Sequence, residues 1–399
     1  MSRDAGRHPS PPRGDRLTRR PVDPATPRLV VWTGVRSQAH VAYGASYLRA
    51  LLPNTTGPIR LVVLGRGGFL GVTAVTDDDL ARLLPHDPRL VLEAAGTPKA
   101  APGEHLTYLA VGAPGIKPWL RLAATHPGRR FEVVVTDEGI GSYGTWRTRR
   151  DSWRREGTRE PWATIRSVAV RAARKLLTTR PWPLYERHDG RWWTNEDVAA
   201  EFRRTADAGA ANPADGTRAP TGATAPDREG GVSGDPAGTR SGSPVAVYLS
   251  QPWIELGVVD AATYVSHVTR VGQACERAGF RFVVRPHPVE DVARYADREV
   301  WAGSTPAELT PRIASAGLVL GATSTALLNL AAVHGRPALR VACPGTETIE
   351  RELSRDQRAL FDQFVGPCVA EADLDEAIAA RGRPRLDPSS RPPDESQRR

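Results

Sequence analysis

The chain has 399 residues, of which 40% are hydrophobic, and a formal net charge of +9. This length and composition are sufficient for two domains with cores of their own. Cysteines 275, 343 and 368 are odd in number and widely spaced, which favours a reducing compartment over a disulfide framework and predicts buried thiols. With no apolar leader and no run of eighteen apolar residues, we expect a cytoplasmic protein that does not span a membrane.

The positive charge is confined to a few segments. Residues 1–27 and 381–399 together contribute +6, and residues 147–180 hold eleven Lys and Arg against three acids. The basicity therefore forms a local patch and does not cover the whole surface, so we expect no nucleic-acid partner.

Composition also predicts the domain boundaries. Residues 1–27 and 381–399 are rich in Arg, Pro, Ser and Asp and are expected to be disordered tails. Residues 205–244 are dense in Gly, Pro, Ala and Thr, which is typical of a linker or looped insertion. An N-terminal domain at 28–204 and a C-terminal domain at 245–380 remain.

Short β-rich runs alternate with helical patterns along both halves. In the first half the pattern predicts strands at 28–34, 59–65 and 131–139 and helices at 38–52, 76–84 and 116–126. In the second half it predicts strands at 245–250, 281–288, 317–322 and 336–342 and helices at 261–278 and 324–335. This alternation indicates an α/β protein with two doubly wound Rossmann-type domains, whose ligand would lie in the cleft between the carboxyl ends of the strands.

Three polar clusters come directly after predicted strands. Asp137 and Glu138 follow "FEVVV", His287 follows "FVVRP", and residues 323–325 (Thr-Ser-Thr) follow "LVLGA" where a helix begins. Each has an ordinary alternative: a solvated turn, a surface histidine, or a plain helix cap. Their joint placement at strand ends favours a site, because hydroxyls at a helix N-terminus suit a phosphate and an imidazole can donate a proton to it.

The motifs "TDEG" (136–139), "RPHP" (285–288) and "TSTAL" (323–327) resemble those of bacterial sialyltransferases, and with "LSQPWIELG" (249–257) the chain is most similar to the bacterial polysialyltransferase family. The resemblance implies a GT-B-like fold and inverting, metal-independent transfer from a CMP-activated sugar to a glycan or glycolipid acceptor. It further implies catalytic roles for Asp137, Glu138 and His287, with either acid as the base. The implied donor-binding residues are Gly139, Gln251, Arg285, Pro288, Thr323, Ser324 and Thr325.

Other motifs do not support a cofactor. "GRGGFLG" (65–71) does not fit the dinucleotide pattern, and the acids of "TDDDL" (76–80) are explained by a helix N-terminus. The chain contains no HExxH, CxxC or GxSxG motif. We therefore expect neither a cofactor nor a bound metal.

Residues 162–182 carry an amphipathic helical pattern whose apolar face holds Ile165, Val168, Ala172 and Leu176. Two interpretations stay open: the helix packs on its own domain, or it rests on an anionic membrane surface and makes the protein peripheral to the plasma membrane.

Alternatives to the glycosyltransferase hypothesis also remain. A CDP-polyol phosphotransferase of teichoic-acid type and a GT-B-like nucleotide-sugar epimerase would use similar domains. A non-catalytic polyanion-binding protein would need only the arginines, and replacing Asp137, Glu138 and His287 would leave it unchanged.

Overall fold

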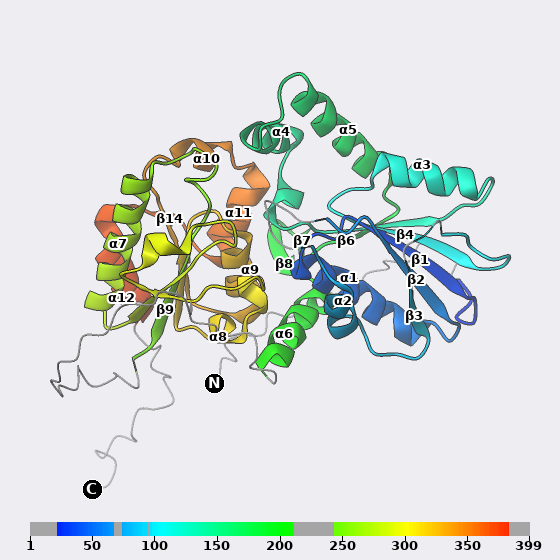
Figure 1. Cartoon of the computed structure of the whole chain (residues 1–399), viewed down its shortest axis with the longest axis horizontal. Helices are drawn as coiled ribbons and strands as arrows, with labels where there is room; N and C mark the ends of the chain where they lie inside the picture. Colours follow the sequence, from blue (N-terminus) through cyan, green and yellow to red (C-terminus); the bar gives the residue numbers. More distant parts are fainter. Residues whose placement is uncertain (1–21, 68–73, 95, 97, 211–242, 383–399) are drawn as a thin grey trace, which may run out of the picture.

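The computed structural model describes residues 22–67, 74–94, 96, 98–210 and 243–382, which form two α/β domains (Figure 1). Most of the two predicted tails and most of the segment predicted as a linker lie outside the described residues. The strands of the first sheet are β1 (Arg28–Thr33), β2 (Ile59–Leu64), β3 (Leu90–Glu93), β4 (His105–Val111), β5 (Glu132–Thr136) and β6 (Arg180–Trp182).

The first sheet has the strand order β3-β2-β1-β4-β5-β6, and every neighbouring pair is parallel. The central strand β1 is buried along its whole length, as expected for a parallel strand covered by helices on both faces. The order reverses between β1 and β4, so a ligand crevice is expected at the carboxyl ends of these strands.

The second sheet repeats this topology in the order β11-β10-β9-β12-β13-β14, again parallel throughout. Its strands are β9 (Val245–Leu249), β10 (Arg281–Arg285), β11 (Glu299–Val300), β12 (Leu318–Gly321), β13 (Ala338–Val341) and β14 (Cys368–Val369). The order here reverses between β9 and β12. Both domains are therefore Rossmann-type, and the predicted α/β fold with two facing doubly wound domains is correct.

Helices cover both sheets. Those of the N-terminal domain are α1 (Gln38–Leu51), α2 (Asp77–Leu83), α3 (Ile116–Thr125), α4 (Trp146–Arg155), α5 (Trp162–Leu177) and α6 (Glu196–Ala210), with the hairpin β7 (Tyr185–His188) and β8 (Arg191–Thr194). Those of the C-terminal domain are α7 (Ala261–Arg277), α8 (Pro311–Ala314), α9 (Thr325–His334), α10 (Glu347–Glu352), α11 (Arg355–Phe364) and α12 (Leu374–Gly382). The 3₁₀ turns are η1 (Leu52–Asn54), η2 (Ile140–Tyr143), η4 (Val292–Tyr295), η5 (Ala307–Leu309) and η6 (Glu371–Asp373).

Two predicted boundaries differ most from the structure. Helix α6 continues to Ala210, past the predicted linker start at 205, because Ala206 is buried in the core. The helix predicted at 162–182 ends at Leu177, and β6 then pairs with β5 as an edge strand. Such a strand tolerates Pro181, which cannot donate a hydrogen bond.

A single apolar core joins the domains. It contains Trp32 and Phe202 from the N-terminal domain together with Leu327 and Phe361 from the C-terminal domain, all fully buried. The two domains are therefore packed against each other through apolar side chains as well as polar contacts.

The three cysteines are free, with Cys275 and Cys343 buried and Cys368 half-buried. Across the described ranges, none of the helices combines the length and apolar character that crossing a membrane requires.

Candidate active site

Asp137 follows β5 directly and is only 1% exposed. Its Oδ2 accepts hydrogen bonds from the backbone N–H of Leu184, at 2.7 Å, and from the hydroxyl of Tyr143. Its Oδ1 is buried without a hydrogen-bond partner among the described residues. Burial raises the pKa of Asp137 to about 6, although both hydrogen bonds oppose this shift. The hydrogen bonds of Asp137 thus hold the acidic motif against the N-terminal domain.

Glu138 has a different environment, with a side chain that is 30% exposed. Its Oε1 lies 2.5 Å from Nη2 of Arg149 on α4, and its backbone N–H donates to the hydroxyl of Ser142 at 2.9 Å. The carboxylate covers Gly112, just past β4, where an added Cβ would lie 2.4 Å from Glu138 Oε2. Glu138 therefore lies over the point where the strand order of the first sheet reverses.

His40, on the first turn of α1, packs beside Glu138. Its Nδ1 accepts a hydrogen bond from the backbone N–H of Arg36 at 3.1 Å. Burial lowers the pKa of His40 to about 4, against the opposing effect of the Glu138 charge. The imidazole is accordingly neutral near pH 7, and the proton is assigned to Nε2 because Nδ1 is an acceptor.

His287 follows β10 and is held by Glu290. The Glu290 Oε2 accepts from the backbone N–H of His287 at 2.6 Å, and its Oε1 accepts from Ser250 Oγ at 2.7 Å and from Tyr295 at 2.9 Å. Because Ser250 directly follows β9, these bonds fix the loop to the centre of the second sheet.

The His287 ring is half-buried and neutral near pH 7. Burial lowers its pKa below the ordinary value, Glu255 opposes this shift and Arg285 reinforces it. The Nδ1 atom accepts from the backbone N–H of Val289 at 3.4 Å, which leaves the proton on Nε2. The imidazole can therefore act as a hydrogen-bond donor through Nε2.

Arg285, Pro288 and Gln251, which the resemblance implies bind the donor, differ in their surroundings. The Arg285 guanidinium is buried and donates to the carbonyls of Trp301 at 2.7 Å and Gly303 at 2.8 Å, so it anchors the following loop. Pro288 is exposed. The Oε1 of Gln251 is buried without a hydrogen-bond partner in the described part of the chain.

The Thr-Ser-Thr cluster lies at the start of α9. Thr323, Ser324 and Thr325 are half-buried, and the Ser324 side chain makes no capping hydrogen bond to the described helix. The first amides of α9 and two hydroxyls thus remain available to an anion, which the positive end of the helix dipole would favour.

Two of the three motifs touch across the domain boundary. The backbone N–H of Ile140 donates to Thr325 Oγ1 at 3.1 Å, and an added Cβ on Gly139 would lie 2.9 Å from that oxygen. The same loop receives Gln357 Nε2, which donates to the carbonyl of Ile140 at 3.0 Å. Ser354 Oγ donates to the carbonyl of Tyr143 at 2.8 Å.

His287 lies at the same edge of the second sheet as the Thr-Ser-Thr cluster. Strands β10 and β12 flank β9, so their carboxyl ends are about 10 Å apart at ordinary strand spacing. His287 and the Thr-Ser-Thr cluster thus lie at one edge of the second sheet, and the loop after the acidic pair contacts α9.

Several residues of this region were not predicted from the sequence. Glu290 has a local signal, because it stands three residues after His287 and can bond back to that residue's backbone. Arg149, His40 and Tyr143 have no such signal. They act on the acidic motif through tertiary contacts with Glu138 or Asp137.

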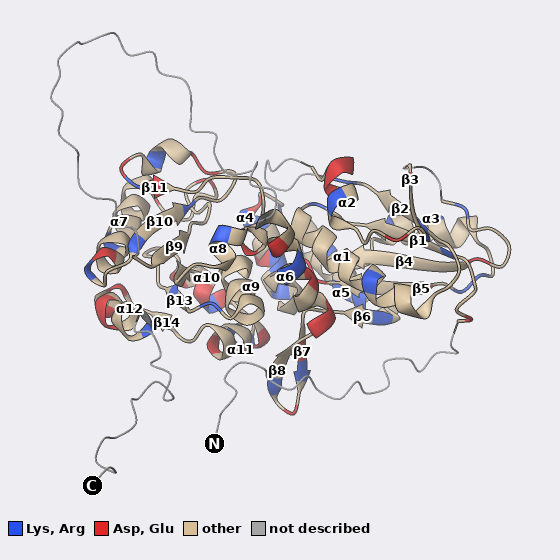
Figure 2. Ribbon diagram, turned by 90° about the horizontal axis from the view of Figure 1, so that it is seen from below, with Lys and Arg blue, Asp and Glu red and all other residues tan. Residues whose placement is uncertain are grey.

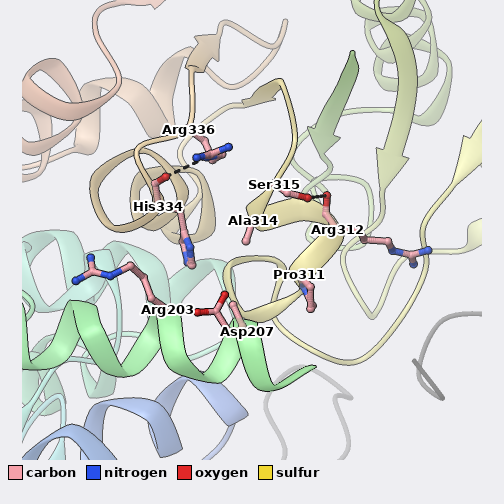
Figure 3. Close-up of a pocket in the computed structure, with 9 residues that line it drawn as sticks. Arg203, Asp207, Pro311, Arg312, Ala314, Ser315, His334 and Arg336 are labelled. Atoms are coloured by element: carbon pink, nitrogen blue, oxygen red, sulfur yellow. Dashed lines mark hydrogen bonds between the residues drawn. The ribbon is translucent and has the colours of Figure 1, made fainter. Parts of the chain in front are cut away.

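A cavity of about 480 Å³ lies elsewhere between the domains (Figure 3). Its lining includes Arg203 and Asp207 of α6 together with Arg312, His334 and Arg336 of the C-terminal domain. His334 ends α9 whereas Thr325 begins it, so this cavity lies about 15 Å from the motifs. Its cations are already engaged: Arg203 bonds the carbonyl of Val333, Arg336 that of His334, and Arg312 stacks on Trp301.

No protein-family model matches the sequence, and no curated protein matches it. Among solved structures, the chain is similar to a 2,6-sialyltransferase from a Photobacterium species in complex with CMP and lactose. The identity is 10%, over 87% of this chain and 78% of that one, with a TM-score of 0.46.

A sialyltransferase from Photobacterium damselae matches at 9% identity over 86% of this chain and 97% of that one, with a TM-score of 0.41. A UDP-GlcNAc 2-epimerase from Methanocaldococcus jannaschii matches at 11% identity over 90% and 93% of the two chains, with a TM-score of 0.42. Likenesses at these identities and TM-scores do not establish an activity.

In the described ranges, no three His, Cys, Asp or Glu residues gather closely enough to hold a metal ion. The groups suited to a phosphate are instead the N-terminus of α9 and the Nε2 of His287.

Proposed function

We propose that the protein is an inverting, metal-independent glycosyltransferase that moves sialic acid or a related sugar from a CMP-activated donor to a glycan or glycolipid acceptor. The observation that carries this proposal is the hydrogen bond between Ile140 N and Thr325 Oγ1, at 3.1 Å, which joins a carboxylate-bearing loop of one domain to a helix N-terminus of the other. Base and phosphate site thereby share one boundary between two Rossmann-type domains.

Glu138 is the proposed general base. Its carboxylate is 30% exposed above the strand-order reversal, whereas Asp137 is buried and bonded to Leu184 and Tyr143. Glu138 takes the proton of the acceptor hydroxyl as the oxygen forms its bond to the anomeric carbon. Asp137 serves as a positioning residue that holds the loop.

The leaving group is stabilised from the opposite domain. As the bond between the anomeric carbon and the phosphate oxygen breaks, its electron pair stays on the CMP phosphate. The neutral His287 donates a hydrogen bond from Nε2 to that phosphate, and the α9 N-terminus with Ser324 faces the same charge. Displacement by the acceptor from the opposite side inverts the anomeric centre.

The test is CMP release by the purified full-length protein, with and without EDTA, on a panel of donors. CMP-sialic acid is the expected donor, and UDP-GlcNAc and CDP-glycerol are the competitors. Turnover of CDP-glycerol instead would indicate a polyol phosphotransferase, and isomerisation of UDP-GlcNAc an epimerase. Dependence of CMP release on a divalent metal would contradict the proposed mechanism.

A matched pair of variants distinguishes the roles of the two acids. We expect Glu138→Gln to lower kcat by about 10²–10⁴ through loss of the base. Asp137→Asn should stay within about tenfold of the parent, because Asn can still accept both hydrogen bonds of Asp137 Oδ2. The exposed Glu376→Gln variant is the control. An equal loss in Asp137→Asn would instead assign the base to the buried carboxylate.

A further inference from the structure

The apolar stripe of α5 faces solvent. Leu176 is 77% exposed, Trp162 63%, Ile165 50% and Val168 48%, whereas Ala163, Ser167 and Ala173 form the buried side of the helix. With the exposed Ala172, these positions recur every three or four residues, so they form one continuous stripe along the helix. The helix therefore packs on its own domain through its small residues and leaves the apolar stripe exposed.

Helix α3 presents a second stripe of the same kind. Ile116 and Leu120 are exposed one turn apart, beside the exposed Lys117 and Arg121. Both helices lie along the same edge of the N-terminal domain, at the top of Figure 1. We call this the α3–α5 surface, made of Ile116, Leu120, Trp162, Ile165, Val168 and Leu176.

The charged residues on the two helices of the α3–α5 surface have a single sign. Helices α3 and α5 contain six Lys and Arg and no Asp or Glu. Arg174 bonds the carbonyl of Ser142, while Lys117, Arg121, Arg166, Arg171 and Lys175 are exposed. Helices α6, α7 and α12, coloured by charge in Figure 2, contain both basic and acidic residues.

We propose that the α3–α5 surface binds the face of a bilayer that carries anionic phospholipids. Exposed apolar side chains can enter the boundary between headgroups and acyl chains, and the adjacent cations can contact lipid phosphates. A second copy of this chain fits poorly, because two such surfaces would bring ten exposed cations together. The inference does not depend on the proposed function.

This placement would bring lipid near the candidate base. Helix α4 packs against α5 and carries Arg149, whose guanidinium contacts Glu138 at 2.5 Å. The membrane-facing helix is thus joined to the acidic loop through one intervening helix.

The test is sedimentation of the full-length protein with vesicles of phosphatidylcholine alone or mixed with phosphatidylglycerol. We expect binding to the mixed vesicles only, and a loss of about tenfold or more in Ile165→Glu. Val91→Glu is the matched control, because Val91 is also 50% exposed but lies on the edge strand β3. It should bind as the parent does.

Charge is tested by Arg171→Glu/Lys175→Glu, which should weaken binding by more than about 25-fold, since each cation near such a surface contributes about fivefold. Arg191→Glu/Arg355→Glu, with exposed cations on other elements, is its control and should stay near the parent. Far-UV circular dichroism and the thermal melting temperature should match those of the parent in all four variants, which shows that they fold.

Three results would overturn the proposal. The first is parental vesicle binding in Ile165→Glu. The second is an equal loss of vesicle binding in each variant and its control, which would show that binding depends on the overall charge of the protein and not on this surface. The third is a dimer in gel filtration that Ile165→Glu dissociates, which would assign the surface to a second copy.

Discussion

At the scale of single residues, the two adjacent carboxylates differ because the chain around them differs. Asp137 is surrounded by protein and has one oxygen without a partner among the described residues, and this burial is what raises its pKa to about 6. Glu138, one residue later, faces the domain boundary. The sequence "DE" alone could not separate these roles, because Leu184, which bonds Asp137, lies 47 residues further along.

The raised pKa of Asp137 makes a prediction about stability. Between pH 4 and about 6 the folded protein holds a proton on Asp137 that the unfolded chain has lost. The free energy of unfolding should therefore fall as the pH rises through this window, by about 1–3 kcal/mol from this group. Asp137→Asn cannot ionise, so its stability relative to the parent should increase by that amount from pH 4 to pH 7.

Urea unfolding at several pH values measures this difference. Asp373→Asn, at an exposed position, is the control and should show no such change. A constant offset of Asp137→Asn across the whole range would contradict the assigned pKa shift.

At the scale of elements, the acidic loop depends on a glycine. Gly139 has a φ of 104°, which favours glycine, and an added Cβ would meet Thr325 Oγ1 at 2.9 Å. We expect Gly139→Ala to lower both stability, by about 1–3 kcal/mol, and turnover. The control is Gly190→Ala. Gly190 has a φ of 79°, but the space around an added Cβ is open, so this variant measures backbone strain without a steric contact.

Calorimetry and CMP release are the measurements. If both glycine variants lose stability equally and Gly139→Ala keeps full turnover, the contact with α9 has no role in catalysis.

Several long, apolar elements were predictable because their patterns are local, although the buried seven-residue strand β4 was not predicted. The run "FEVVV" before Asp137 and the helix after Ser324 appear where they were expected, and so does the strand that precedes His287. Strands β11 and β14 have two residues each, too few for any periodicity to be visible. Helix α6 extends into the segment predicted as a linker because its Ala206 is buried, which composition alone does not reveal.

The candidate site, like the fold, could be predicted only in part. Position past a strand end could be inferred from the sequence, so the three motifs were expected at the carboxyl edges of the sheets. The partners that orient them could not, since the contacts of Arg149 with Glu138 and of Tyr143 with Asp137 depend on how the loop and α4 fold back on the acidic pair. The direction of the α5 apolar stripe likewise depended on which side of the helix the domain covers.

At the scale of the whole molecule, the domain boundary is closed by contacts of several kinds. The Tyr185 hydroxyl donates to Asn329 Oδ1 at 2.8 Å, and Gln363 exchanges two hydrogen bonds with the backbone of Trp192. A shared apolar core lies beside these bonds. The domains are therefore expected to unfold together, in one calorimetric transition.

The bond between Ile140 and Thr325 also bears on the timing of the reaction. A nucleotide that occupies the start of α9 has to enter and leave where this bond and the one from Gln357 now lie. Separation of the lobes, more than chemistry, would then set the steady-state rate. In rapid-quench experiments the first equivalent of CMP should appear as a burst ahead of slower cycles, whereas linear accumulation from the start would show that departure of the spent nucleotide is unhindered.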